Sequence, residues 1–447
     1  MIGQSLITAS EDGSVLTHVT DSTTRKHVGT FAPSGIFVNK DKYFPLPTIT
    51  FATESASNIA AGIKTTLDMV GAASGHTANE LYAAVDLHMT DATAHNKTIP
   101  EKAAELMERE VPAGRLYDPV HTTLGFDGVM KKAMNGIEVE MKIDNISKAF
   151  LLDVSIDQTS DTVSFSFVSW VLSLFGPDKV QMPWNYHSAF CAFMKREGRI
   201  VHLFNLKDAR FACLSRCAAI VLFHWEDFRD FLERNDCITN KLACLVRDAM
   251  ELEYIRIVLA AVAAYGLQLI SPFFRKTMGR STHSELQHFF TKLYHLLKIH
   301  DLDSRFFQFD QPYFEEVSSA LFDGIKSRDY YGEAVVSCIV AITTEHPTDC
   351  LMLVNLMRPE MSNLLSRQRG TYYGFGEHQN KSLNVFNQVE NIDSAPTNNI
   401  QMERQCGDQD HRLFKKGALS ATSQDNIIKY TTGMRNVDRD SSIFRSM

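Results

Sequence analysis

The chain has 447 residues, of which 44% are hydrophobic and 22% are charged, and its formal net charge is −8. This composition excludes a wholly disordered chain, and the length predicts about two or three domains. The apolar runs are shorter than the roughly 18–20 residues of a membrane span, and residues 1–5 do not resemble a signal peptide, so we expect neither a membrane protein nor a secreted one.

The first 30 residues are rich in Ser and Thr and poor in large apolar side chains. They predict a mobile or partner-bound N-terminal arm. In residues 36–38 and 43–51, β-branched and aromatic side chains alternate with polar ones between prolines. This pattern predicts short strands or a hairpin, and so a small β element in the N-terminal part of the chain.

Helical periodicity begins near residue 55. Apolar side chains recur there every three or four residues, at Ile59, Ile63, Leu67 and Val70. A second helix is expected to start at Asn79, with Val85 and Met89 on its buried face, and a third over residues 101–109. Alternation in residues 137–141 predicts a strand.

From residue 164 to about residue 367 the pattern is that of nearly continuous helix. Breaks are expected at the turn-forming positions Gly176-Pro177, Gly198, Asn235-Asp236, Ser271-Pro272 and Pro347. Bulky apolar stripes within this region are explained by core packing. Residues 376–447 are rich in Asn, Gln, Ser and Asp, which predicts a weakly structured tail.

The sequence lacks the common catalytic and metal-binding motifs. It has no Walker phosphate loop, no nucleophile elbow, no H-E-x-x-H and no dinucleotide-binding glycine motif after a strand. Its eight cysteines include no C-x-x-C pair, which argues against zinc and favours reduced thiols. His288 and His295 could share a helix face, but no third ligand stands at helical spacing. We therefore predict a protein that is not an enzyme and holds no metal or cofactor.

Positive charge is concentrated in the middle of the chain. Residues 188–300 hold 16 basic and 11 acidic residues, so this segment carries +5 and the remainder −13. Binding to a polyanion follows local phosphate contacts rather than net charge. The basic residues at predicted helix ends and turns are the candidate phosphate contacts: Lys195, Arg196, Arg199, Lys207, Arg275, Lys276, Arg280, Lys292, Lys298, Arg305, Arg367 and Arg369. An ordinary solvated basic surface is the alternative.

Several segments, taken in order, resemble the nucleoproteins of rhabdoviruses. Asp41–Pro47 and Leu81–Ala84 are similar to a strand entry and a helix of that family. Phe190–Arg199 followed by Phe204–Ala209 resembles its Phe-rich helix, basic turn and next helix start, and Ser271–Phe273 resembles its Ser-Pro loop. Met361–Arg367 is similar to the last helix before the C-terminal segment. The family's basic first-lobe helix has no clear match.

The resemblance implies a two-lobed, mainly α-helical nucleoprotein that clamps single-stranded RNA between its lobes. Its segments would be an N-terminal arm (1–30), an N-terminal lobe (31–205), a C-terminal lobe (206–375) and a flexible tail (376–447). Copies would polymerise on the RNA into a helix or ring by exchanging the arm and a C-terminal loop or tail. A viral phosphoprotein and the polymerase would be partners, in the virion and the host cytoplasm or nucleus. The long tail resembles plant-infecting members.

Matched by position, the resemblance implies RNA contacts at Arg199, at Arg275 or Lys276, at Lys298 or Arg305, and at Arg367. Each would bind phosphate without reading bases. Two alternatives remain. A viral structural or adaptor protein that binds protein and no RNA would show scattered, neutral charge clusters. An enzyme without a local signature would show titratable groups converging in a closed apolar pocket.

Overall fold

The computed structural model describes residues 2–20, 23–25, 29–32, 34–51, 55–90, 98–110, 113–140, 162–177, 182, 185–203, 213–234, 240–279, 281–328, 332–373 and 391–398. Most of these residues are helical and a small sheet lies near the N-terminus, so the predicted mainly α-helical fold with a small β element is confirmed. The chain divides into two compact units. Unit 1 contains residues 1–120, 277–288 and 367–447, and unit 2 contains residues 121–276 and 289–366.

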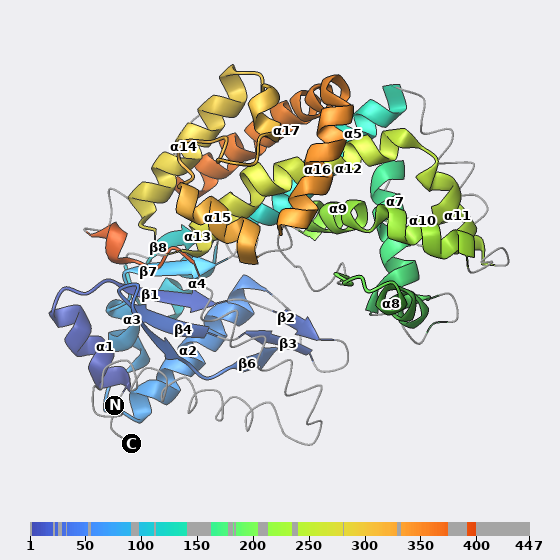
Figure 1. Ribbon diagram of the computed structural model, residues 1–447. Helices are drawn as coiled ribbons and strands as arrows, with labels where there is room; N and C mark the ends of the chain where they lie inside the picture. The colour runs from blue at the N-terminus through green and yellow to red at the C-terminus, as the bar shows by residue number, and fades with distance from the viewer. Residues whose placement is uncertain are drawn as a thin grey trace, which may run out of the picture. The chain divides into compact units, whose positions relative to one another are not determined.

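Unit 1 is built on a five-stranded sheet with strand order β5-β4-β1-β7-β8 (Figure 1). Its strands are β1 (Leu16–Thr20), β4 (Ser34–Val38), β5 (Lys42–Pro45), β7 (Leu87–Thr90) and β8 (Gly114–Tyr117). β1 pairs antiparallel with β4 and parallel with β7. A three-stranded sheet is formed by β2 (Thr23–Arg25), β3 (Gly29–Ala32) and β6 (Ile49–Phe51). The expected strands over residues 36–38 and 43–51 are therefore present.

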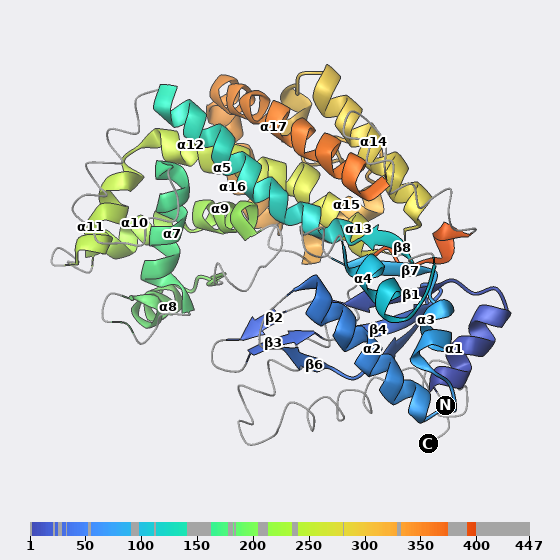
Figure 2. The ribbon, with the colours of Figure 1, turned by 180° about the vertical axis from the view of Figure 1, so that it is seen from behind.

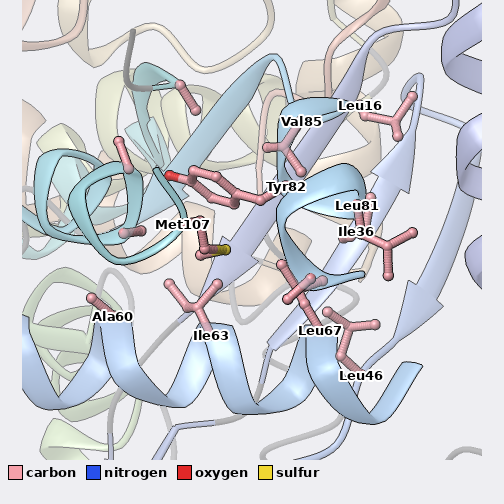
Figure 3. Close-up of a cluster of buried hydrophobic side chains, with 14 of the residues drawn as sticks. Leu16, Ile36, Leu46, Ala60, Ile63, Leu67, Leu81, Tyr82, Val85 and Met107 are labelled. Carbon is pink, nitrogen blue, oxygen red and sulfur yellow. The ribbon is translucent and has the colours of Figure 1, made fainter. Parts of the chain in front are cut away.

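Four α-helices lie wholly within the described part of unit 1: α1 (Ile2–Glu11), α2 (Ala56–Ala72), α3 (Ala78–Ala83) and α4 (Ile99–Leu106). Apolar side chains of α2 and α3 pack against Leu16 and Ile36 on one face of the five-stranded sheet (Figure 3). The predicted buried face of α2 is confirmed at Ile59, Ile63, Leu67 and Val70. Burial of apolar area of this kind provides the main stabilisation of the unit.

Local capping explains where α2 and α3 begin. The Ser55 hydroxyl accepts a hydrogen bond from the Asn58 N–H, which satisfies a free donor in the first turn of α2. Thr77 and Glu80 form a complete capping box at α3. The second predicted helix therefore starts as expected but ends at Ala83. Met89 lies in β7 instead, because parallel pairing with β1 satisfies its backbone.

The opposite face of the sheet is covered by a short piece of the C-terminal region. Ile392 and Ala395, in and after the 3-10 turn η9 (Ile392–Ser394), pack with Val19 and Met89. The Pro396 carbonyl accepts a hydrogen bond from His283, and burial lowers the pKa of this histidine to about 4. The predicted flexible tail is thus corrected at residues 391–398, and its other residues lie outside the described ones.

The secondary-structure elements described in unit 2 are all helices (Figure 2). Its elements, three of which continue into unit 1, are α5 (Thr122–Glu140), α7 (Val163–Phe175), α8 (His187–Arg196), α9 (Cys213–Phe223), α10 (Trp225–Arg234), α11 (Lys241–Met250), α12 (Glu253–Tyr265), η5 (Gly266–Ile270), α13 (Ser271–Met278), α14 (His283–Ile299), η6 (Ser304–Phe307), α15 (Ser319–Arg328), α16 (Glu333–Glu345) and α17 (Pro347–Tyr373). The 3-10 turn η2 (Pro119–His121) precedes α5. Helices end at or next to the predicted breaks near residues 176, 198, 235 and 347.

One predicted break does not occur. α12, the π-helical turn η5 and α13 form a continuous helix over Glu253–Met278. The Ser271 N–H donates to the Gly266 carbonyl, five residues back. This wider turn shifts the hydrogen-bond register just before Pro272, which has no N–H to donate.

The continuous helix is long and apolar enough to cross a membrane, by length and composition alone. The sequence pattern does not predict a helix of this length, because a break is expected at Pro272. In the structure, 94% of its most apolar window is buried. That burial is typical of the core helix of a globular unit.

A cluster of aromatic rings joins α8 to α7 and α10. Phe175 stacks on Phe228 with ring centroids 4.5 Å apart, and Phe190 lies 4.9 Å from Phe228. Phe231 meets both Phe175 and Phe190 edge to face. Such aromatic pairs add to the stabilisation from burial. They hold α8, and with it the basic turn that follows α8, rigidly on unit 2.

Two further expectations are wrong. Residues 137–140 belong to α5 and not to a strand, because the buried side chains recur at helical spacing: Phe126, Met130, Met134 and Ile137. The N-terminal arm is not free over residues 2–20, which form α1 and β1. Leu6 and Leu16 are completely buried, and β1 lies inside the sheet. The predicted lobe boundary at residues 205–206 lies outside the described residues, and the two units follow other divisions of the chain.

Candidate nucleic-acid interface

The basic turn after α8 has a defined backbone. Lys195 and Arg196 are exposed in the last turn of α8, where positive side chains also complement the helix dipole. Gly198 follows in the left-handed region, with φ 67°. The Gly198 N–H donates to Lys195 O and the Arg199 N–H to Met194 O, which is a Schellman helix end. The turn therefore presents three cations within five residues.

Arg199 is held by a buried carboxylate. Its guanidinium is paired with Oδ1 of Asp227, and Oδ2 of Asp227 accepts a hydrogen bond of 2.9 Å from Nδ1 of His224. Burial opposes ionisation of Asp227, but the hydrogen bonds from His224 and Arg199 outweigh it and lower the pKa of Asp227. Nε2 of His224 accepts a 3.0 Å hydrogen bond from the His202 N–H. Both nitrogens of this buried imidazole are thus used to fix residues 199–203.

Acidic side chains neutralise much of this surface. Arg234 pairs with Glu197 at 3.4 Å and with Asp230 at 3.7 Å, and Arg229 pairs with Glu226. Arg199 is itself neutralised by Asp227. Among the predicted basic residues of the turn, the two at the end of α8 remain the best placed to contact an external phosphate.

A second group of predicted residues lies on α13, α14 and η6. Arg275 is exposed, Lys276 is half-buried and Lys292 is exposed. Nζ of Lys298 donates to the Tyr294 hydroxyl at 2.7 Å and lies over its ring. Arg305 forms a forked ion pair with Asp303, with contacts between 2.8 and 3.1 Å.

The structure does not bring the predicted residues of unit 2 into one cluster. α8 lies at one end of the unit and α14 at the other, in both views (Figures 1 and 2). Arg367 and Arg369 are in the part of α17 that belongs to unit 1. Lys207 and Arg280 lie outside the described residues.

The acidic partners were missed by sequence analysis. Asp227 is 28 residues from Arg199, and only packing of α8 against α10 brings the two together. A local signal did exist, because His224 and Asp227 stand three residues apart at the start of α10, on one helix face. The Arg305–Asp303 pair was also visible as close neighbours in the sequence.

A thiol and an imidazole also lie side by side in α8. Sγ of Cys191 is 3.6 Å from Nε2 of His187, whose Nδ1 donates to the Phe175 carbonyl at 2.7 Å. Burial raises the pKa of the Cys191 thiol, which keeps it protonated and therefore weakly nucleophilic. This pair consequently gives no support to the enzyme alternative.

Comparison of the chain with protein-family models and with curated proteins finds no match.

Proposed function

We propose that the protein encapsidates viral single-stranded RNA by binding its phosphates without regard to base sequence. The observation that carries the proposal is the exposed pair Lys195 and Arg196, beside a turn whose backbone is fixed by hydrogen bonds, one of them from the His202 N–H to His224. The serial resemblance to rhabdovirus nucleoproteins supports the same function. Ammonium and guanidinium groups on a rigid helix end suit phosphate, because the contact needs charge and donors but no base code.

The finer parts of the proposal concern assembly. Two RNA-clamping lobes, polymerisation into a helical or ring nucleocapsid, and binding of a phosphoprotein and polymerase in the virion and host cell follow from the resemblance. Residues 2–20 form α1 and the central strand β1 within unit 1 of their own chain, so an exchanged segment would come from the C-terminal region instead. Copies joined head to tail along RNA need no closed symmetry.

A second candidate is a structural or adaptor protein that binds protein and no RNA. It is favoured by the neutralisation of Arg199 by Asp227 and of Arg305 by Asp303, and by the separation of the basic groups. RNA binding therefore has to be measured directly.

The test compares two double variants with the same change of charge. Lys195→Ala/Arg196→Ala removes the proposed contacts, whereas Arg229→Ala/Arg234→Ala removes two arginines of α10 that already have acidic partners. Binding of a fluorescent oligouridylate is measured over a salt series. We expect the first variant to lower the log–log salt slope by about 1.4, at roughly 0.7 per single-strand contact, and the second to leave it almost unchanged.

If the salt slope falls equally in the two variants, the effect comes from general electrostatics, and Lys195 and Arg196 are not the binding site. If the unmodified chain neither copurifies with nuclease-resistant RNA nor binds the oligonucleotide at low salt, encapsidation is wrong and the adaptor function is favoured. Helix content measured by circular dichroism controls for misfolding of either variant.

A further inference from the structure

Three potential metal ligands meet where two helices of unit 2 pack together. Glu253 is the first residue of α12, Glu345 is the last residue of α16, and His346 connects α16 to α17. α12 packs against α16, which brings residues more than 90 positions apart into contact. One ligand atom from each of the three side chains lies within 4.8 Å of the others.

The imidazole nitrogen of this cluster has an unusual environment. Nε2 of His346 is buried and has no hydrogen-bond partner, although the side chain as a whole is 23% exposed. It lies 3.0 Å from Oε1 of Glu253 and 3.9 Å from Oε2 of Glu345. The shorter contact has the distance of a hydrogen bond without its geometry. A short distance without hydrogen-bond geometry is typical of two ligands of one metal ion, because each ligand directs its lone pair at the ion and not at the other ligand.

The spacing fits a small divalent cation. Zinc binds imidazole nitrogen and carboxylate oxygen at about 2.0–2.2 Å, so neighbouring ligands of one ion lie roughly 3–4 Å apart. The two printed distances fall in that range. Both carboxylates are about half exposed, so a small rotation brings their oxygens to an ion, and water completes the coordination.

Arg256 shares the same space. Its Nη1 atom lies 3.4 Å from Oε1 of Glu253 and 3.8 Å from Oε2 of Glu345. Without a metal ion it compensates part of the repulsion between the two carboxylates. With an ion bound, its positive charge opposes the ion at close range.

We propose that Glu253, Glu345 and His346 form a binding site for a divalent transition-metal ion of the zinc class, with Arg256 as the cation that occupies the site in the metal-free protein. One imidazole and two carboxylates suit Zn²⁺ or Co²⁺ better than Ca²⁺ or Mg²⁺, which prefer oxygen ligands alone. The bound ion would fasten the start of α12 to the α16–α17 junction. The inference does not depend on RNA binding.

The probes are Zn²⁺, measured by calorimetry, and Co²⁺, measured by visible absorption, on the full chain. His346→Ala is expected to weaken binding by at least about tenfold, and His288→Ala, which removes an exposed histidine of α14, to leave it unchanged. The Co²⁺ spectrum should lack the thiolate charge-transfer band that a cysteine site would give.

The Arg256→Ala variant separates this site from adventitious binding. Removing the competing cation should tighten Zn²⁺ binding by about tenfold or more, and Zn²⁺ should restore the melting temperature that the variant loses in the presence of a chelator. Nonspecific surface binding would not respond to Arg256 in this direction. Unchanged Zn²⁺ affinity in both His346→Ala and Arg256→Ala, or a thiolate band with Co²⁺, would overturn the proposal.

Discussion

His18 and His88 face each other across the parallel strands β1 and β7, with their Nδ1 atoms 3.1 Å apart and their rings stacked at a centroid distance of 4.8 Å. Both rings are completely buried, and neither Nε2 atom has a hydrogen-bond partner. One ring must donate from Nδ1 and the other accept, so the pair holds different tautomers. Protonating both would place two positive charges in contact inside the core.

Unit 1 is therefore expected to lose stability in acid. Burial lowers the pKa of His18 to about 3, and burial followed by the charge of His18 lowers that of His88. At pH values between the pKa of about 6.5 in the unfolded state and the lower pKa values in the folded state, only the unfolded state binds protons at these histidines. The free energy of unfolding therefore falls as the pH decreases. For His18 the loss at pH 5 is about 2 kcal/mol, and His88 adds to the loss in the same direction. Denaturant unfolding of unit 1 at pH 7 and pH 5 measures it.

The control for this pH dependence is His76→Gln, since His76 lies at the surface beside Gln4. It should keep the wild-type difference between the two pH values, whereas His88→Gln should reduce the difference. An unchanged difference in His88→Gln would remove the pair as the cause.

Glu138 caps the start of α7 from the neighbouring helix α5. Its carboxylate accepts hydrogen bonds from the N–H groups of Val163 and Ser164, at 2.7 and 3.2 Å, and from the Ser164 hydroxyl. Glu138→Ala leaves these buried donors unpaired and should lower the free energy of unfolding of unit 2 by about 2–3 kcal/mol. Glu138→Gln keeps an acceptor and should cost less. Equal costs in thermal unfolding would exclude the capping role.

Two glycines of α5 give opposite expectations. A Cβ atom at Gly125 would lie 2.9 Å from Cδ1 of Leu364 on α17, but one at Gly128 would meet nothing within 4 Å. Gly125→Ala should destabilise unit 2 by about 1–3 kcal/mol through overpacking. Gly128→Ala should stabilise it by roughly 0.5–1 kcal/mol through helix propensity. Chemical denaturation compares them, and the same sign for both changes would contradict the packing of α5 on α17.

His224 is expected to control the order of the turn that carries Arg199. His224→Phe keeps an aromatic ring but loses the hydrogen bonds to Asp227 and to the His202 N–H. Amide exchange in residues 199–203 should then accelerate by about tenfold or more, as expected for a loss of about 1–2 kcal/mol. His295→Phe on α14 is the matched control. Unaltered exchange in His224→Phe would mean that the turn is held by other contacts.

Periodic patterns in the sequence are sufficient to predict helices, because the residues of their buried face are close together in the chain. The spacing of Ile59, Ile63 and Leu67 predicts α2, because the residues of one helical face recur every three or four positions. Pairing between distant strands produces no such repeat in the sequence. The residues of β1 are therefore predicted to belong to a mobile or partner-bound arm, although the partner strands β4 and β7 place them inside the sheet. The short pattern at residues 137–140 was ambiguous, and α5 continued through it because tertiary packing favours the helix.

The candidate site divides in the same way. The sequence alone indicates where positive charge is concentrated and that α8 ends in a basic turn, since both depend on neighbouring residues. It does not indicate which cations are neutralised: Asp227 reaches Arg199 only after α10 packs on α8. The approach of His346 to Glu253 likewise requires α16 to lie on α12. Ion pairs and ligand clusters depend on distances in space, and folding sets those distances between residues that are far apart in the chain.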